Sequence, residues 1–243
     1  MKLAMWSGPR NLSTAMMYAF AQRRDFDVWD EPFYGPYLWM TGLAHPMREE
    51  ILQSRPEDAE TVEQRLMSPQ PVGRHVYHKH MCQHMIDGMP RAFMGECVNV
   101  FLIRHPARVT ASFAKGYPQV TAEDIGFRQQ AELYDEAIAL GQQPIVIDSA
   151  DIRRDPEAML RALCDAVGLG WDPAMLSWPA GPKPYDGVWA PVWYRSLHRT
   201  TGFAGPEGDL PPMSGRLKDV ANEAMPYYAR MKEKALKAEK PPL

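Results

Sequence analysis

The chain has 243 residues, a formal net charge of −3 at pH 7 and three cysteines. This length suits one large α/β domain, because no Gly/Ser-rich linker or block of charge divides it. The weakly acidic balance disfavours general nucleic-acid binding, so any anion site must gather its basic residues locally. The cysteines form no paired framework, the N-terminus lacks a signal-peptide pattern, and no run approaches the ~20 apolar residues of a membrane span. We therefore expect a cytoplasmic protein without membrane or nucleic-acid partners, and its oligomeric state stays open.

The first element combines a short apolar strand, a tight turn and an Ala- and Met-rich helix that runs to about residue 24. Free N–H groups at a helix start, together with the helix dipole, attract anions, and Arg10 adds a full positive charge there. The same pattern also fits an ordinary helix that is capped by Asn11 or Ser13. No Gly-Lys pair follows Gly8, so the Walker A motif is absent and an ordinary ATPase or GTPase is disfavoured.

The rest of the chain alternates between short apolar segments and helical patterns. Further strands are expected at residues 26–30, 74–80, 98–103 and 145–147. Helices are expected at residues 41–67 with a break, and at 107–115, 121–141 and 155–167. Residues 31–37 are expected to form a stiff aromatic loop, because their prolines forbid a regular strand interior. This order predicts a three-layer α/β/α domain with a mainly parallel central sheet and right-handed crossovers.

Prolines and aromatic residues concentrate in a few segments. The 23 prolines are roughly twice the average usage, and they crowd residues 32–46 and 173–191. We expect residues 176–210 to form aromatic, Pro-rich loops over a site of the single domain 1–243, and residues 232–243 to form a flexible tail. Aromatic loops near the rim of the sheet would suit an apolar or cationic acceptor, including a quaternary ammonium, although simple packing explains them as well.

Several charged residues follow directly after predicted strands. Because ligands of parallel sheets bind at the carboxyl ends of the strands, Arg10, Glu31 and Arg104 are expected on one rim. The third strand adds either Lys79 or His80 to the same rim. This grouping predicts a site with both cationic and acidic side chains.

A second phosphate-binding pattern begins at Arg104, which ends the strand at 98–103, and Ser112 follows eight residues later in the next helix. A guanidinium and a hydroxyl brought together in this way can hold a phosphate, because arginine forks onto phosphate oxygens. A salt-bridged arginine on the rim and a serine on the helix surface would give the same pattern.

Together, the two stretches resemble the P-loop-like sulfotransferases of the bacterial type, which use 3′-phosphoadenosine-5′-phosphosulfate (PAPS). In that family, Pro-Lys/Arg-Ser-Gly-Thr-Thr holds the 5′-phosphosulfate, and residues 9–14 fall on this motif with Arg10 near the bridging oxygen. The family's Arg and the Ser eight residues later, which hold the 3′-phosphate, match Arg104 and Ser112. The resemblance implies that the PAPS-binding residues are Arg10, Asn11, Leu12, Ser13, Thr14, Arg104 and Ser112.

Three departures from the family pattern stand out. Leu12 replaces the family's glycine, so the backbone is expected not to approach the ligand in the same way. Arg108 stands where the family often has aspartate. The C-terminal run that contacts the nucleotide in the cytosolic animal type is missing, so adenine recognition is unassigned and Arg195 and Arg199 are candidates for a further phosphate contact.

The resemblance implies in-line transfer of a sulfuryl group to a hydroxyl or amine of a small metabolite, with no metal expected. Arg10 would neutralise the departing phosphate oxygen. Glu31 is the first candidate for the catalytic base and His80 the second, while Lys79 would orient the acceptor or contact the sulfonate.

Three alternatives compete with this interpretation. The first is a nucleotide-dependent kinase, and the second is a protein that binds adenosine bisphosphate without catalysis. The third is a zinc site, because His78, His80, Cys82 and His84 alternate and would share one face of a strand.

Overall fold

The computed structural model describes residues 1–238, which contain one five-stranded parallel sheet with the strand order β2-β3-β1-β4-β5. Its strands are β1 (Lys2–Ser7), β2 (Phe26–Asp30), β3 (His75–Met81), β4 (Val98–Ile103) and β5 (Ile145–Asp148). Strands β1 and β4 are buried along nearly their whole length, which fits their unbroken apolar sequences and a sheet that is covered on both faces. The predicted parallel sheet is confirmed, and β2 and β4 have the predicted bounds.

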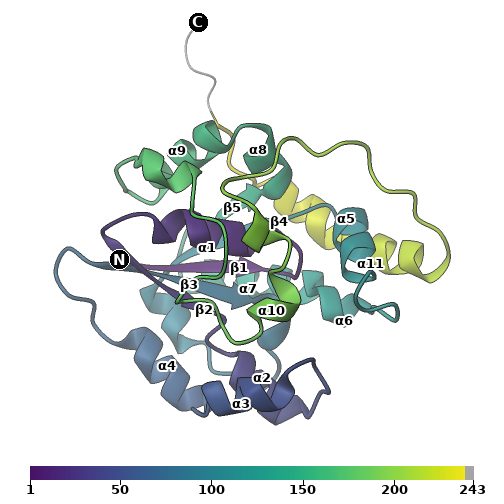
Figure 1. Cartoon of the computed structure of the whole chain (residues 1–243), viewed down its shortest axis with the longest axis horizontal. Helices are drawn as coiled ribbons and strands as arrows, with labels where there is room; N and C mark the ends of the chain where they lie inside the picture. Colours follow the sequence, from purple (N-terminus) through teal and green to yellow (C-terminus); the bar gives the residue numbers. More distant parts are fainter. Residues whose placement is uncertain (239–243) are drawn as a thin grey trace, which may run out of the picture.

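Helices cover the two faces of this sheet (Figure 1). The α-helices are α1 (Ser13–Ala21), α2 (Tyr34–Thr41), α3 (Arg48–Ser54), α4 (Ala59–Met67), α5 (Pro106–Phe113), α6 (Ala122–Ile125), α7 (Phe127–Ala139), α8 (Ser149–Arg154), α9 (Pro156–Ala166), α10 (Ala190–Trp193) and α11 (Gly215–Lys232). The 3-10 helices are η1 (Cys82–His84), η2 (Ala92–Glu96), η3 (Pro173–Leu176) and η4 (Leu197–Arg199). Figure 1 shows α8 and α9 on one side of the strands and α2, α3 and α4 on the other, as expected for a three-layer α/β/α domain.

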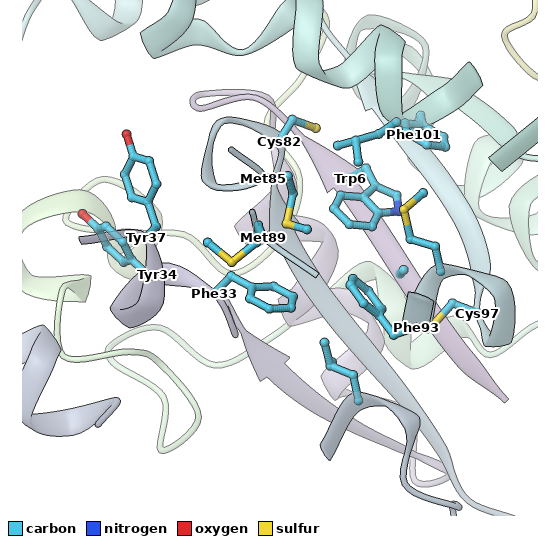
Figure 2. Close-up of a cluster of buried hydrophobic side chains, with 14 of the residues drawn as sticks. Trp6, Phe33, Tyr34, Tyr37, Cys82, Met85, Met89, Phe93, Cys97 and Phe101 are labelled. Atoms are coloured by element: carbon cyan, nitrogen blue, oxygen red, sulfur yellow. The ribbon is translucent and has the colours of Figure 1, made fainter. Parts of the chain in front are cut away.

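Each face of the sheet has its own hydrophobic core. On one face, Trp6, Phe33 and Phe93 pack with side chains of α2, α4 and α7, as Figure 2 shows for the aromatic and methionine part of this cluster. On the other face, Phe20 and Tyr77 pack with side chains of α1 and α9. Because both faces are apolar, polar side chains collect at the ends of the strands.

Three local predictions were wrong or incomplete. The expected loop at 31–37 is α2 from Tyr34 onward, because Pro36 lies in its first turn, where a missing N–H breaks no helical hydrogen bond. The expected helix at 121–141 is divided at Gly126, whose left-handed φ of 66° separates α6 from α7. Helix α11 was not predicted, and it accommodates Pro226 in its interior.

The C-terminal segment leaves α11 and returns to the sheet. Ala235 forms a parallel bridge with Val146, and the N–H of Leu236 donates to the Val146 carbonyl at 2.7 Å. Of the expected flexible tail at 232–243, residues 239–243 lie outside the described part of the chain. Over residues 1–238, no helix has the combination of length and apolar character that a membrane crossing requires.

Candidate active site

The loop between β1 and α1 takes a strained and tightly packed path. A side chain at Gly8 would collide with the carbonyl oxygen of Ile125, so a glycine is needed there. Arg10 and Leu12 have left-handed φ angles of 62° and 75°, which cost non-glycine residues on the order of 1–3 kcal/mol each. Such strain persists only where surrounding contacts enforce it, and it is typical of ligand-binding loops.

The start of α1 differs from the expectation of a capped helix. Leu12 occupies the N-cap position, and no side chain caps the helix, so neither Asn11 nor Ser13 has this role. Instead, the Asn11 amide donates to the Leu102 carbonyl at 3.2 Å and ties the loop to the end of β4. Leu12, which stands where the family has glycine, adopts the left-handed conformation that glycine takes easily. The N–H groups of the first turn of α1 therefore remain available to an anion.

The two predicted phosphate-binding stretches meet at the rim of the sheet. Strands β1 and β4 are paired, with Ser7 opposite Leu102, so the segments that follow them leave the sheet side by side. The Arg104 guanidinium donates to the Arg10 carbonyl at 2.7 Å, and Arg10 Nε donates to Ser112 Oγ at 3.0 Å. Residues separated by 102 positions in the chain thus form one cationic and hydroxyl-bearing surface.

Arg10 has no carboxylate partner among residues 1–238, and its side chain contacts Ser112 instead. Burial and the neighbouring Arg104 lower the pKa of the Arg10 guanidinium, although arginine remains charged at neutral pH. A bound anion would relieve both effects, because it would supply the missing counter-charge.

A buried network of four polar side chains stands at the ends of β2 and β3. Lys79 Nζ contacts the carboxylates of Asp30, at 3.0 Å, and Glu31, and it also donates to the Tyr194 hydroxyl at 2.8 Å. The Tyr194 hydroxyl in turn donates to Asp30 Oδ2 at 2.9 Å. The Glu31 backbone has a left-handed φ of 43°, so this residue is also strained.

The network holds two carboxylates against one ammonium. Burial, reinforced by the Asp30 charge, raises the pKa of Glu31 despite the opposing Lys79 ammonium. Burial by itself would lower the pKa of Lys79, but the two carboxylates outweigh this effect and raise it, so the ammonium stays charged. Glu31 is therefore a carboxylate whose pKa lies above that of an exposed glutamate.

The two histidines near Glu31 have different surroundings. His80 lies in the core, where its ring stacks on Trp6 with centroids 4.4 Å apart, and it does not line the cavity described below. Neighbouring residues of a strand point to opposite faces, and Lys79 points to the cavity. His80 therefore has no access to an acceptor in the cavity, which argues against its expected role as a base. His84, which we considered only as a ligand in the zinc alternative, has Nε2 at 4.0 Å from Glu31 Oε2.

The zinc alternative requires histidines that converge on one point. His84 is instead stacked between Tyr34 and Tyr37, with centroid distances of 4.7 Å to each ring. Within residues 1–238, no three His, Cys, Asp or Glu side chains are grouped so that they could hold a metal ion. His78 and His80 do contact each other, with ring centroids 5.9 Å apart, but the pattern does not gather the ligands that a zinc ion needs.

The two predicted phosphate-binding stretches and the Glu31, Lys79 and Tyr194 side chains open onto one cavity of about 280 Å³. The predicted residues that line it are Arg10, Asn11, Leu12, Ser13, Thr14, Glu31, Lys79, Arg104 and Ser112. The remaining wall is largely aromatic and comes from Tyr34, Tyr37, His45, His84, Phe113, Tyr117, Trp193 and Tyr194, together with Asp124. Arg195 and Arg199 do not belong to this lining.

Glu207 lies beside the cavity, in the loop between η4 and α11, and contacts three arginines. The sequence of this loop carries no motif that would predict these contacts. The Glu207 carboxylate accepts from Arg104 Nε at 2.9 Å, and it lies 2.9 Å from Arg108 Nε and 3.1 Å from an Arg153 Nη. The Glu207 side chain is only 5% exposed. A carboxylate therefore occupies the anion-binding face of Arg104, the residue that was expected to hold a phosphate.

With this geometry in place, comparison with known proteins gives the family. Residues 1–235 match the family model described as "Sulfotransferase domain". The chain belongs to the sulfotransferase domain family. The predicted family is therefore confirmed.

Curated relatives of this sulfotransferase domain are larger proteins. It is 40% identical to "Branched-chain-amino-acid aminotransferase-like protein 1" of Arabidopsis thaliana over 223 residues, which are 92% of this chain and 40% of that protein. It is 36% identical to "Branched-chain-amino-acid aminotransferase-like protein 2" of the same organism, with the same coverage. The chain thus spans less than half the length of the curated relatives it matches.

Solved structures confirm the fold. The sulfotransferase domain of the curacin biosynthetic pathway is similar with a TM-score of 0.54 and 14% identity, covering 97% of this chain and 98% of that one. A sulfotransferase from Alicyclobacillus acidocaldarius gives a TM-score of 0.52 and 13% identity, covering 96% and 95%. The sulfotransferase domain of the Synechococcus PCC 7002 olefin synthase gives 0.51 and 15%, covering 94% of both chains.

Proposed function

We propose that this sulfotransferase domain moves the sulfuryl group of PAPS to a hydroxyl or amine of a small acceptor. The observation that carries the proposal is the contact between the two strand-to-helix junctions, in which Arg104 donates to the Arg10 carbonyl and Arg10 donates to Ser112. One bisphosphorylated nucleotide could bridge these groups, with the 5′-phosphosulfate at residues 10–14 and the 3′-phosphate at Arg104 and Ser112.

The transfer step needs a base on one side of the sulfur and positive charge on the other. The acceptor hydroxyl would give its proton to the ionised Glu31 carboxylate while its oxygen forms a bond to sulfur. The bond between sulfur and the bridging phosphate oxygen would break, leaving 3′,5′-adenosine bisphosphate. Arg10 and the N-terminus of α1 would stabilise the charge that develops on that oxygen, and Lys79 would keep Glu31 in position.

A thermal-shift comparison tests the nucleotide class. We expect 3′,5′-adenosine bisphosphate to raise the melting temperature and ATP with Mg²⁺ to leave it unchanged, because a ligand at 100 times its Kd adds about 2.7 kcal/mol to the apparent stability. Stabilisation by ATP with Mg²⁺ alone would favour a kinase. Transfer of labelled sulfate from PAPS to a metabolite pool then separates an enzyme from a protein that only binds the nucleotide. The name of the plant relatives concerns amino acids, which supports including amino-containing acceptors in that pool.

The pH dependence of turnover tests the base. Glu31 must be ionised to accept a proton. Because burial raises its pKa, the fall of kcat on acidification should occur at a higher pH than for a glutamate with the ordinary pKa of about 4.3. The measurement is kcat at saturating PAPS between pH 5 and 9, with 3′,5′-adenosine bisphosphate affinity as the control. A kcat that stays constant while the protein remains folded at the acidic end would contradict Glu31 as the base.

A further inference from the structure

Asp124 lies in the wall of the candidate active-site cavity and has no cationic partner among residues 1–238. Its Oδ2 atom accepts from the backbone N–H of Thr121 at 2.8 Å, which is one half of the capping box of α6, and from the Thr121 hydroxyl at 3.0 Å. Within residues 1–238, no donor reaches Oδ1, and no Lys, Arg or His nitrogen lies within salt-bridge distance of this carboxylate. One oxygen of Asp124 is therefore free to accept from a ligand.

Aromatic rings line the same cavity as this carboxylate. Phe113, Tyr117 and Trp193 are stacked on one another, with centroid distances of 5.5, 6.1 and 6.4 Å and interplanar angles of 25° or less. His45 links Tyr117 to Tyr37 through edge contacts, each with centroids 6.0 Å apart. Figure 2 shows the neighbouring Tyr34 and Tyr37 rings with their hydroxyl ends directed away from the Trp6 and Phe93 core.

The negative charge of Asp124 affects the pKa values of side chains in the aromatic wall of the cavity. Burial together with the Asp124 carboxylate raises the pKa of Tyr37 to about 12 and raises the pKa of Tyr117. Burial lowers the pKa of His45 despite the opposing effect of Asp124, so this imidazole is neutral at pH 7 and supplies no counter-charge. The network of Asp30, Glu31 and Lys79 contains two carboxylates and one ammonium, so it has no spare positive charge. Within residues 1–238, the cavity wall around Glu31 and Asp124 therefore has no cation other than Lys79, whose charge the Asp30 and Glu31 carboxylates offset.

From these contacts we infer that the acceptor is an alcohol or amine that also carries an organic ammonium group, held by Asp124 and the faces of Tyr117 and Trp193. Aromatic faces and a carboxylate together favour alkylammonium ions. The inference rests on the proposed function, because it places the reacting hydroxyl of that molecule at Glu31. An anionic acceptor would be repelled by Asp124 and Glu31, which makes the charge a specificity determinant.

Matched pairs of small alcohols test the inference by isothermal titration to protein saturated with 3′,5′-adenosine bisphosphate. Choline is compared with 3,3-dimethylbutan-1-ol, and 2-aminoethanol with propan-1-ol, because each pair differs in charge but little in shape. We expect at least one cation to bind ~10-fold or more tightly than its neutral partner, equivalent to about 1.4 kcal/mol. Equal affinities within both pairs would overturn the inference.

Substitutions at Asp124 and Tyr117 test whether these residues cause the preference for the cation. Asp124→Asn keeps an oxygen for the Thr121 contacts but removes the charge, so it should erase the preference for the cation and leave the neutral alcohol within ~2-fold. Tyr117→Phe should keep the preference because it keeps the aromatic face, whereas Tyr117→Leu should reduce it several-fold. If Asp124→Asn does not fold, the comparison of these two Tyr117 variants tests the inference. A preference that survives both Asp124→Asn and Tyr117→Leu would overturn the assignment.

Label transfer from PAPS separates this inference from the proposed function. A cation preference without label transfer would support the ammonium site and contradict sulfuryl transfer. Label transfer to the neutral alcohols at the same rate as to the ammonium alcohols would support sulfuryl transfer and overturn the ammonium site.

Discussion

Replacing Glu31 with glutamine is expected to lower kcat by at least ~10²-fold, the lower edge of the range for general-base catalysis. Glutamine has nearly the same shape but cannot accept the acceptor's proton, whereas the phosphate-binding groups lie on other elements of the cavity wall. The measurement is single-turnover transfer of labelled sulfate from PAPS, with calorimetric affinity for 3′,5′-adenosine bisphosphate as the internal check. That affinity should stay within ~3-fold of the unmodified protein, since an uncharged side chain at this position removes no phosphate contact.

Two controls make this result specific. His80→Asn should retain turnover if the protein folds, because His80 is stacked on Trp6 in the core and does not line the cavity. His84→Asn tests the histidine that approaches Glu31 to 4.0 Å. Full activity of Glu31→Gln, combined with loss of activity in His84→Asn, would transfer the role of base to His84.

Changes at Arg104 and Glu207 are expected to alter nucleotide affinity in opposite directions. Arg104→Ala should weaken 3′,5′-adenosine bisphosphate binding by ~30-fold or more, because removing one partner of a hydrogen-bonded charge pair costs about 2–5 kcal/mol. Glu207→Gln should tighten binding, because the carboxylate now on Arg104 would no longer compete with the 3′-phosphate. Calorimetric titration of each variant measures both effects.

The ligand itself provides the sharpest control for this pair. Adenosine 5′-phosphate lacks the 3′-phosphate, so its affinity should change little in either variant. Arg161→Ala serves as the protein control, since Arg161 pairs with Glu157 on the outer surface of α9. Equal losses for both nucleotides in Arg104→Ala would show that Arg104 does not hold the 3′-phosphate.

The amino-acid sequence predicts the frame of this site well. Apolar runs identify β1, β2 and β4, and parallel strands present their carboxyl ends on one rim, so Arg10, Glu31 and Arg104 could be assigned to the same edge without coordinates. The choice between Lys79 and His80 could not be made in this way. Successive side chains of a strand point to opposite faces, and only the structure shows that His80 packs against Trp6 and Phe93 in the core while Lys79 lines the cavity.

By itself, the sequence thus determined the family and the parallel sheet and pointed to the two stretches proposed to bind phosphate, because these depend on local hydrophobic patterns and short motifs. Only the tertiary structure decided that Glu207 occupies the anion face of Arg104 and that Asp124, which has no cationic partner within residues 1–238, lines the cavity together with aromatic rings. The carboxylate of Glu207 meets an arginine 103 positions away, and the loop that carries it has no periodic pattern. Such contacts arise from how loops pack over the finished sheet, which a local pattern cannot specify.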